Sequence, residues 1–262
     1  MEETLADIEF LALSPNRVTV LSVLADGRHT RSELAELTGA SQATLGRILG
    51  DFEERNWVRR ESGGYVATAT GALVAEGFEE LMSVVDTERE LRDVVTYLPT
   101  DAMGFDVRCL ADATIVTPTE TRPNAPLQRL LTLMSDADSV TAFSHAFNDQ
   151  SLSVVADRGD DLAFQAVLTR GAVDALTGDD RLRASLRSVV TSETATVNVY
   201  DGEIPVAVTL ADDVVNILAR DDRGVVQASV DTDHPEVREW AQRRFEHYRV
   251  QSTPLSAADI DA

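Results

Sequence analysis

The chain of 262 residues contains no lysine, so all 23 of its basic residues are arginines. Its acidic residues number 45, and the formal net charge at pH 7 is -22. The hydrophobic content of 44% is nevertheless that of a folded protein, and no long block of like charges suggests disorder. We interpret the missing lysine and the excess of acid as adaptation to molar salt, where a densely acidic surface stays hydrated. An ordinary acidic protein that lacks lysine by chance is the alternative.

Cysteine, histidine and long apolar runs are also scarce. The single Cys109 excludes an intrachain disulfide, and the four histidines show no metal-ligand spacing: His29, His145, His234 and His247. The first twenty residues carry four acids instead of the basic region of a signal peptide, and no apolar run approaches the length of a membrane span. We therefore expect a cytoplasmic protein that holds no metal and no cofactor.

The acidity is unevenly distributed along the chain. Residues 1 to 70 contain 7 arginines and 11 acids, whereas residues 71 to 262 contain 16 arginines and 34 acids. Residues 28–60 contain six arginines and five acids, which makes this the one long stretch of the sequence near neutrality. The charge pattern predicts an N-terminal module, residues 1–70, that differs in its binding partner from the rest.

Capping and turn signals divide this module into short elements. Ser14-Pro15 starts a helix that stops near Gly27, Thr30-Arg31-Ser32-Glu33 fits a capping box before a second helix, and Ser41 caps a third helix that runs to about Arg55. Two strands, 57–61 and 65–68, then flank the turn Ser62-Gly63-Gly64. Three helices followed by a β-hairpin predict a winged helix-turn-helix.

The third helix has two different faces. Its apolar face is formed by Leu45, Ile48, Leu49 and Phe52, and its opposite face begins with Gln42, Ala43, Gly46, Arg47 and Gly50. Its acids come only later, beyond the turns that would enter a DNA groove. Two glycines cost about 1 kcal/mol each in helix propensity, which favours a role in close approach to DNA.

This arrangement predicts double-stranded DNA as the partner. We expect Arg47 to pair with guanine and Gln42 with adenine, while Ala43 or Thr44 contacts a thymine methyl. Phosphate or minor-groove contacts are expected from Arg31 at the second helix and from Arg59 and Arg60 in the wing. A winged helix that binds another protein, without DNA contact, is the alternative.

A long apolar stripe connects this module to the remainder of the chain. Residues 71–98 place Val74, Phe78, Leu81 and Val85 at helical spacing, and Pro99 ends the helix. The stripe either packs on the body of the protein or forms a dimer seam. We favour a homodimer, because DNA readers of this size usually work as symmetric pairs.

Residues 99–262 alternate strand and helix signals. The expected strands are 113–117, 139–144, 162–168, 194–200, 204–210, 214–219 and 225–230, and the expected helices are 126–135, 148–156, 171–188 and 235–249. Asp201-Gly202, Ala211-Asp212-Asp213 and Asp222-Arg223-Gly224 are interpreted as hairpin turns. The fold class is thus mixed α/β: an N-terminal winged helix, a connecting helix and a C-terminal α/β domain with a mixed sheet.

A ligand pocket in such a domain should lie where strands end. This singles out six candidate effector-binding residues: Thr117, Arg122, Ser144, His145, Asn148 and Arg170. Arg122 or Arg170 would suit an anionic metabolite. We expect no enzyme, because Ser144 and His145 are adjacent on a strand and so point to opposite faces. An enzyme with an appended winged helix is the alternative.

The chain also resembles a known group of proteins. The stretch DGRHTRSELAELTGASQATLGRILGDFEERNWVRRESGGYVATATG resembles the winged-helix module of archaeal, especially halophilic, transcription regulators. The phrases LRDVVTYLP, FDVRCLADATIVTPTETRPNAPLQRLL and DADSVTAFS resemble the effector domain of the methanogenesis regulators of filamentous archaea. This resemblance implies a DNA-binding regulator with a C-terminal sensing domain.

The order of elements after residue 138 is similar to the phospholipase D-like fold that some archaeal sugar-responsive regulators use for sensing. Active members need a histidine and a lysine two residues apart. Here His145 is followed by Ala146 and Phe147, and the chain has no lysine. If that fold is present, the resemblance implies that its phosphodiesterase chemistry is absent.

Overall fold

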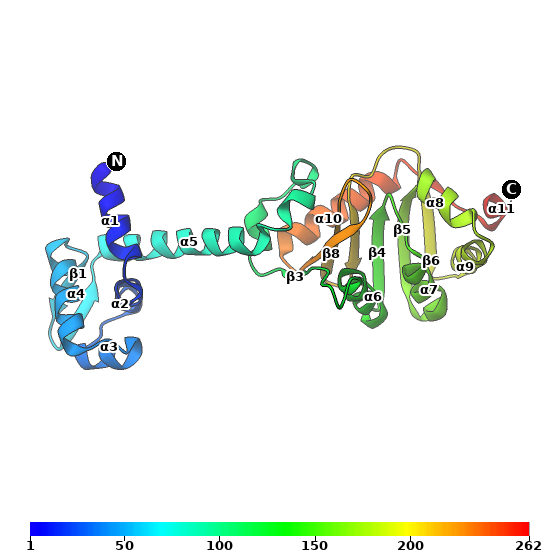
Figure 1. Ribbon diagram of the computed structural model, residues 1–262. Helices are drawn as coiled ribbons and strands as arrows, with labels where there is room; N and C mark the ends of the chain where they lie inside the picture. Colours follow the sequence, from blue (N-terminus) through cyan, green and yellow to red (C-terminus); the bar gives the residue numbers. More distant parts are fainter. Residues whose placement is uncertain (262) are drawn as a thin grey trace. The chain divides into compact units, whose positions relative to one another are not determined.

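A computed structural model describes residues 1–261 of the chain (Figure 1). The chain folds into two compact units, residues 1–86 and a second unit that begins at Thr87. The helix α5 (Ala69–Leu91) contains the boundary between them. The predicted connecting segment 71–98 therefore contributes residues to both units.

The N-terminal unit is a winged helix preceded by an extra helix. Its elements before α5 are α1 (Glu2–Ala12), α2 (Pro15–Asp26), α3 (Arg31–Thr38), α4 (Gln42–Glu54), β1 (Val58–Glu61) and β2 (Gly64–Ala67). Thr30 and Glu33 form the predicted capping box, and the Ser41 side chain accepts from the backbone N–H of Thr44. Backbone hydrogen bonds between His29 and Tyr65 add one bridge to the β1–β2 hairpin. The sequence did not predict α1.

The core of this unit forms where the predicted apolar faces meet. Leu45, Ile48, Leu49 and Phe52 of α4 are all buried, as expected, against α2 and α3 residues such as Leu24. Burial of each of these side chains stabilises the fold by about 1.5–3 kcal/mol, relative to leaving the side chain exposed to water. This packing fixes the opposite face of α4 toward solvent.

The connecting helix is shorter than the sequence predicts. It ends at Leu91, and two short 3-10 turns follow, η1 (Val95–Tyr97) and η2 (Thr100–Ala102), before η3 (Val107–Leu110). Leu91, Val94 and Leu98 are buried in the core of the second unit. The contacts of Val94 and Leu98 are made by backbone outside α5, which periodicity alone could not distinguish from a continuing helix.

The second unit contains an eight-stranded mixed sheet, which confirms the predicted fold class. Its strands are β3 (Thr114–Val116), β4 (Ser139–Ser144), β5 (Ala163–Thr169), β6 (Ala195–Tyr200), β7 (Ala207–Ala211), β8 (Val214–Arg220), β9 (Val226–Thr232) and β10 (Thr253–Pro254). The strand order is β10-β6-β5-β4-β7-β8-β9-β3. Strands β4, β5 and β6 are parallel neighbours, and all other neighbouring pairs are antiparallel.

Helices cover both faces of this sheet (Figure 1). One face packs against α10 (Pro235–Arg249), and the other against α6 (Ala125–Asp136), α7 (Asp149–Arg158), α8 (Arg170–Thr177) and α9 (Asp180–Thr191). The short α11 (Ala257–Ile260) adds Ile260 to the second core. Alternate residues of β4 serve the two cores, with Phe143 in one and Val140 in the other, as the pleat of a strand requires.

Two local predictions for this unit are wrong. The segment 171–188 is not one helix, because Asp179 accepts hydrogen bonds from the backbone N–H groups of Arg181 and Leu182 and so begins a new helix. Asp201-Gly202 is not a hairpin turn, because β5 and β4 lie between β6 and β7 in the sheet. The other two predicted hairpins, β7–β8 and β8–β9, are confirmed.

In residues 1–261 no single helix combines the length and the apolar content of a membrane span. The pair α1 and α2, bent by 97° at their junction, meets the criteria of length and composition only when taken together.

Candidate nucleic-acid interface and effector pocket

The first turns of α4 are exposed, as the sequence predicts, but the side chains of Gln42 and of Arg31 on α3 each bind the other residue's backbone carbonyl. A guanidinium nitrogen of Arg31 donates to the backbone carbonyl of Gln42, and the Gln42 amide lies 3.4 Å from the Arg31 carbonyl. A Cβ at Gly46 would overlap the Arg31 guanidinium, so a larger residue there would displace this flexible group. Gly46 therefore makes room for Arg31, whereas the space beside Gly50 is open.

Arg47 is the charged side chain that this face leaves free. It is exposed, and within residues 1–261 it has neither an ion pair nor a hydrogen bond. Ala43 beside it is also exposed, whereas Thr44 is half-buried and its hydroxyl lies 2.9 Å from the Ser41 hydroxyl. Arg47 and Ala43 are thus the best-presented of the predicted base-contacting residues.

The wing arginines differ from each other in their contacts. Arg59 forms an ion pair of 2.7 Å with Glu61, and the Arg60 guanidinium carbon lies 5.7 Å from the centre of the Tyr65 ring. As neighbours on β1 the two side chains point to opposite faces of the hairpin, so one surface cannot use both. Arg28, which the sequence analysis did not single out, donates to the Ser62 carbonyl at the wing turn.

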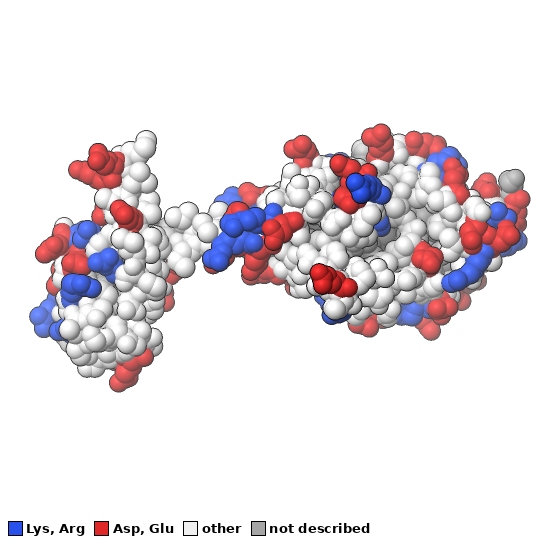
Figure 2. All heavy atoms as spheres, viewed as in Figure 1, with Lys and Arg blue, Asp and Glu red and all other residues white. Residues whose placement is uncertain are grey.

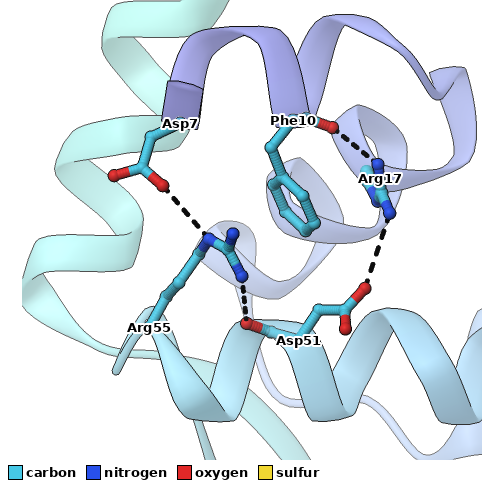
Figure 3. Close-up of polar contacts among 5 residues, drawn as sticks. All are labelled: Asp7, Phe10, Arg17, Asp51 and Arg55. Carbon is cyan, nitrogen blue, oxygen red and sulfur yellow. Dashed lines mark hydrogen bonds and ion pairs between the residues drawn. The ribbon is translucent and has the colours of Figure 1, made fainter. Parts of the chain in front are cut away.

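Other charges of this unit hold α1 in place (Figure 3). The guanidinium carbons of Arg17 and Arg55 each lie 3.8 Å from the centre of the Phe10 ring. Arg17 also pairs with Asp51 at 3.5 Å, and Arg55 pairs with Asp7 at 3.1 Å. Asp51 is consequently engaged in this cluster, which reduces the acid that α4 presents to solvent.

The visible face of the N-terminal unit in Figure 2 shows arginines next to acids and no continuous basic patch. The Glu33 carboxylate on the same unit accepts from the Thr30 backbone N–H, and hydrogen bonding with the Thr30 backbone and side chain lowers the pKa of Glu33 from 4.5. Binding that depends on many phosphate contacts would need a broad basic surface. The face of the unit that Figure 2 shows offers no such surface.

In the second unit the structure brings three of the predicted effector residues together at the end of β4. Ser144 is buried and bonds the backbone of Ala146, and the Asn148 side chain caps α7 by accepting from the Ser151 N–H at 2.7 Å. His145 lies between them and is partly exposed. Ser144 and Asn148 thus shape the loop that presents His145.

The remaining candidates are poorly placed for that site. Arg170 forms an ion pair of 2.7 Å with Asp201, so its charge is already neutralised. Thr117 and Arg122 are exposed and follow β3, which lies four strands away from β4 across the sheet. The structure keeps Thr117 and Arg122 away from the His145 loop. Arg170 lies closer, because it directly follows Thr169, whose hydroxyl lies 3.4 Å from the His145 carbonyl.

A residue that the sequence analysis missed completes the site. Arg220, the last residue of β8, lines a pocket of about 580 Å³ together with His145. Burial and the nearby Arg220 charge lower the pKa of His145 below 6.5, opposed by a backbone hydrogen bond with Ile204. The signal in the sequence was a charged residue at the end of an apolar strand. The predicted strand 214–219 ended at Ala219, one residue before Arg220.

A winged helix with an exposed recognition helix, followed by a separate α/β unit with a pocket, has the construction of a DNA-binding transcription regulator. Residues 5–90 match the HVO_A0261 N-terminal domain, and residues 123–251 match the middle domain of the methanogenesis regulatory protein FilR1. The chain thus carries an HVO_A0261 N-terminal domain followed by a domain that matches the FilR1 middle domain. The resemblance seen in the sequence is thereby confirmed.

Solved structures similar to this chain are distant in sequence. TrmBL2, described as an archaeal chromatin protein with a novel mode of DNA binding, is 13% identical, with 95% of this chain and 98% of that chain covered and a TM-score of 0.42. The phospholipase D family member Nuc from Salmonella typhimurium is 11% identical, with 55% and 99% covered and a TM-score of 0.44. NucT from Helicobacter pylori is 13% identical, with 55% and 98% covered and a TM-score of 0.42. No curated protein matches the chain.

Proposed function

We propose that the chain is a sequence-specific transcription regulator that reads double-stranded DNA with α4. The observation that carries this proposal is the exposed, unpaired guanidinium of Arg47 on the leading turns of α4, beside the small side chain of Ala43. Arginine in this position of a recognition helix donates two hydrogen bonds to guanine in the major groove. Arg31 and one of the two wing arginines, Arg59 or Arg60, supply phosphate or minor-groove contacts.

We further propose that the regulator works as a homodimer assembled through α5. Beyond Phe78 this helix exposes four apolar side chains, each 42–47% accessible: Leu81, Met82, Val84 and Val85. Leu81, Val84 and Val85 share one helix face, since they are three and four residues apart. Exposed apolar surface of this extent favours association, and a symmetric dimer would present two copies of α4 to two half-sites.

In this proposal the second unit binds a small effector that alters DNA affinity, and it carries out no catalytic step. The pocket at the ends of β4 and β8 supports the role, because ligand sites of α/β domains lie outside the carboxyl ends of strands. A regulator of this kind acts in the cytoplasm, where the DNA of a cell without a nucleus is found.

Gel-shift titration tests the DNA assignment, with operator sites first located by genome-wide mapping of bound DNA. We expect Arg47→Ala to weaken operator binding about 5- to 150-fold, the equivalent of about 1–3 kcal/mol for one bidentate base contact. Arg223→Ala removes the same charge from an exposed turn of the second unit and serves as the control. Unchanged sequence preference in Arg47→Ala would refute the assignment, and wild-type protein that binds no DNA at any salt would favour the protein-binding alternative.

Sedimentation of the full chain tests the dimer. We expect Val84→Glu to produce a monomer, because it places a charge in the proposed seam. Leu37→Glu replaces a comparably exposed side chain of α3, 57% accessible, and should leave the dimer intact. A Val84→Glu protein that remains dimeric would place the interface elsewhere.

A further inference from the structure

We propose that the pocket between His145 and Arg220 binds a small organic anion with one negatively charged group on a compact apolar body. Its role as the effector site rests on the proposed regulatory function, but the binding itself does not. Three observations carry the proposal: the placement of the two residues, the state of the Arg220 charge, and the composition of the pocket walls.

The sheet topology places both residues at one edge. Strand β7 lies between β4 and β8 and is antiparallel to each, so β4 and β8 run in the same direction. His145 directly follows β4 and Arg220 is the last residue of β8, so both lie at the carboxyl ends of strands. The pocket of about 580 Å³ that they line therefore lies at one edge of the sheet, where residues 96–99 and the turn 221–224 complete its walls.

The Arg220 charge has no counterion among residues 1–261. Its Nη1 donates to the Gly224 carbonyl at 2.8 Å, while its Nε is buried and has no hydrogen-bond partner. The neighbouring Asp221 carboxylate is occupied by the backbone N–H groups of its own turn and by the Gln227 amide at 2.8 Å. An uncompensated charge that is partly removed from water is costly, and a bound anion would offset that cost.

This state differs from that of two other arginines in the unit. Arg129 pairs with the buried Asp231, and Arg170 pairs with Asp201. Burial without such a partner lowers the pKa of the Arg220 guanidinium, although an arginine stays protonated. An unpaired, half-buried guanidinium that faces a pocket is suited to bind a carboxylate or a phosphate through charge-assisted hydrogen bonds.

The pocket walls indicate the rest of the ligand. Tyr97, Leu98, Pro99, Val206 and Leu218 provide apolar surface, and the volume is much larger than a bare carboxylate or phosphate group requires. Burial and the Arg220 charge lower the pKa of His145, so Arg220 is the main positive charge of the pocket, and Asp221 and Asp222 at the lining add two negative charges. These features favour a single negative charge and an apolar body over a polyanion.

The test uses the full chain without DNA, at one fixed KCl concentration, and measures binding by calorimetry. Benzoate is the probe, because it joins one carboxylate to an apolar ring, and inorganic phosphate and benzyl alcohol are its charged and neutral counterparts. We expect benzoate to bind with a Kd of about 1 mM or below and to bind more tightly than either counterpart.

Two variants locate the site. Arg220→Gln should weaken benzoate binding at least tenfold, the equivalent of about 1.4 kcal/mol, while Arg122→Gln, with the same change of net charge, should not. Equal affinity of Arg220→Gln and wild type, or no benzoate binding, would overturn the proposal, and tighter binding of phosphate would overturn the organic part. Because DNA is absent, these outcomes are independent of the gel shifts that test DNA binding.

Discussion

Phe10 is expected to hold α1 on the winged helix through its contacts with two cations, and its replacement tests this. The ring is half-buried and lies between the guanidinium groups of Arg17 and Arg55, each 3.8 Å from its centre (Figure 3). It also makes edge-to-face contacts with Phe52 and Trp57, with ring centres 6.1 Å apart in both pairs. Two substitutions separate the cationic part of this stabilisation from the apolar part.

Phe10→Leu keeps most of the apolar contact and removes the ring. Each cation–π contact contributes about 0.5–1 kcal/mol at exposed sites, and more when the cation is desolvated. The Arg17 and Arg55 side chains are only 19% and 32% accessible, so we expect Phe10→Leu to lower the free energy of unfolding by about 1–2 kcal/mol. Phe10→Ala also loses apolar burial and should cost about 3–4 kcal/mol, below the upper range for a fully buried phenylalanine.

The two tryptophans allow this unit to be observed separately. Trp57 is buried in the N-terminal unit and Trp240 in the second, so Trp240→Phe leaves Trp57 as the sole tryptophan reporter. Urea titration of full-length protein in this background gives the unfolding free energy of the unit from the midpoint and slope of the transition. A separate reporter is needed because two units do not unfold as one two-state system.

The matched control is Phe78→Leu, which changes another half-buried phenylalanine packed on the same core, with no arginine over its ring. A shape change of this kind usually costs less than about 1.5 kcal/mol. If Phe10→Leu costs no more than Phe78→Leu, the two cations contribute nothing measurable and the reasoning fails. If Phe10→Leu and Phe10→Ala lower the free energy of unfolding by the same amount, the leucine side chain retains no stabilising apolar contact.

Three further predictions concern the pKa of His145, the substitution of Gly71 and the effect of KCl on stability. Arg220→Gln should raise the pKa of His145 toward 6.5, because it removes the repulsion of a nearby cation; NMR titration of the imidazole signals would show this, and an unshifted pKa would contradict it. Gly71→Ala should destabilise the N-terminal unit in urea titration, although alanine usually favours a helix by about 1 kcal/mol, because a Cβ would overlap the Trp57 carbonyl. Thermal stability of the full chain should rise with KCl; full stability in low salt, with no gain on addition, would count against the halophilic interpretation.

The N-terminal unit was predictable because its signals are local. Thr30 and Ser41 cap helices through side-chain hydrogen bonds to backbone only three residues away, and Gly39 takes the left-handed conformation, with φ of 68°, that ends α3. Each of these signals involves a few consecutive residues, so the sequence displays them directly. The helix α1 lacked such a signal, since it is held by side-chain contacts with Arg17 of the next helix and with Arg55, which is distant in sequence.

The features of the second unit that were not predicted depend on contacts between residues that are distant in sequence. The Asp201-Gly202 pair has the composition of a hairpin turn, yet β6 pairs with β5 and not with β7, and nothing in a two-residue turn specifies which strands become neighbours. The role of Gly46 depended in the same way on Arg31, a residue of the preceding helix. Arg220 was missed because its importance comes from the absence of a counterion, which only the folded arrangement defines.

A net charge of -22 opposes binding to DNA, which is also negatively charged. What matters for binding is therefore the charge close to the leading turns of α4. Asp51 faces Arg17 and Glu33 belongs to a capping box, so the leading turns of α4 present Arg47 without an adjacent free acid. At about 1 M salt the screening length is only about 3 Å, so acids of the second unit hardly repel DNA. The same salt removes most of the gain from counterion release, which leaves base-edge contacts to supply affinity. Operator binding by this chain should consequently depend weakly on salt, whereas loss of Arg47 should impair it at every salt concentration.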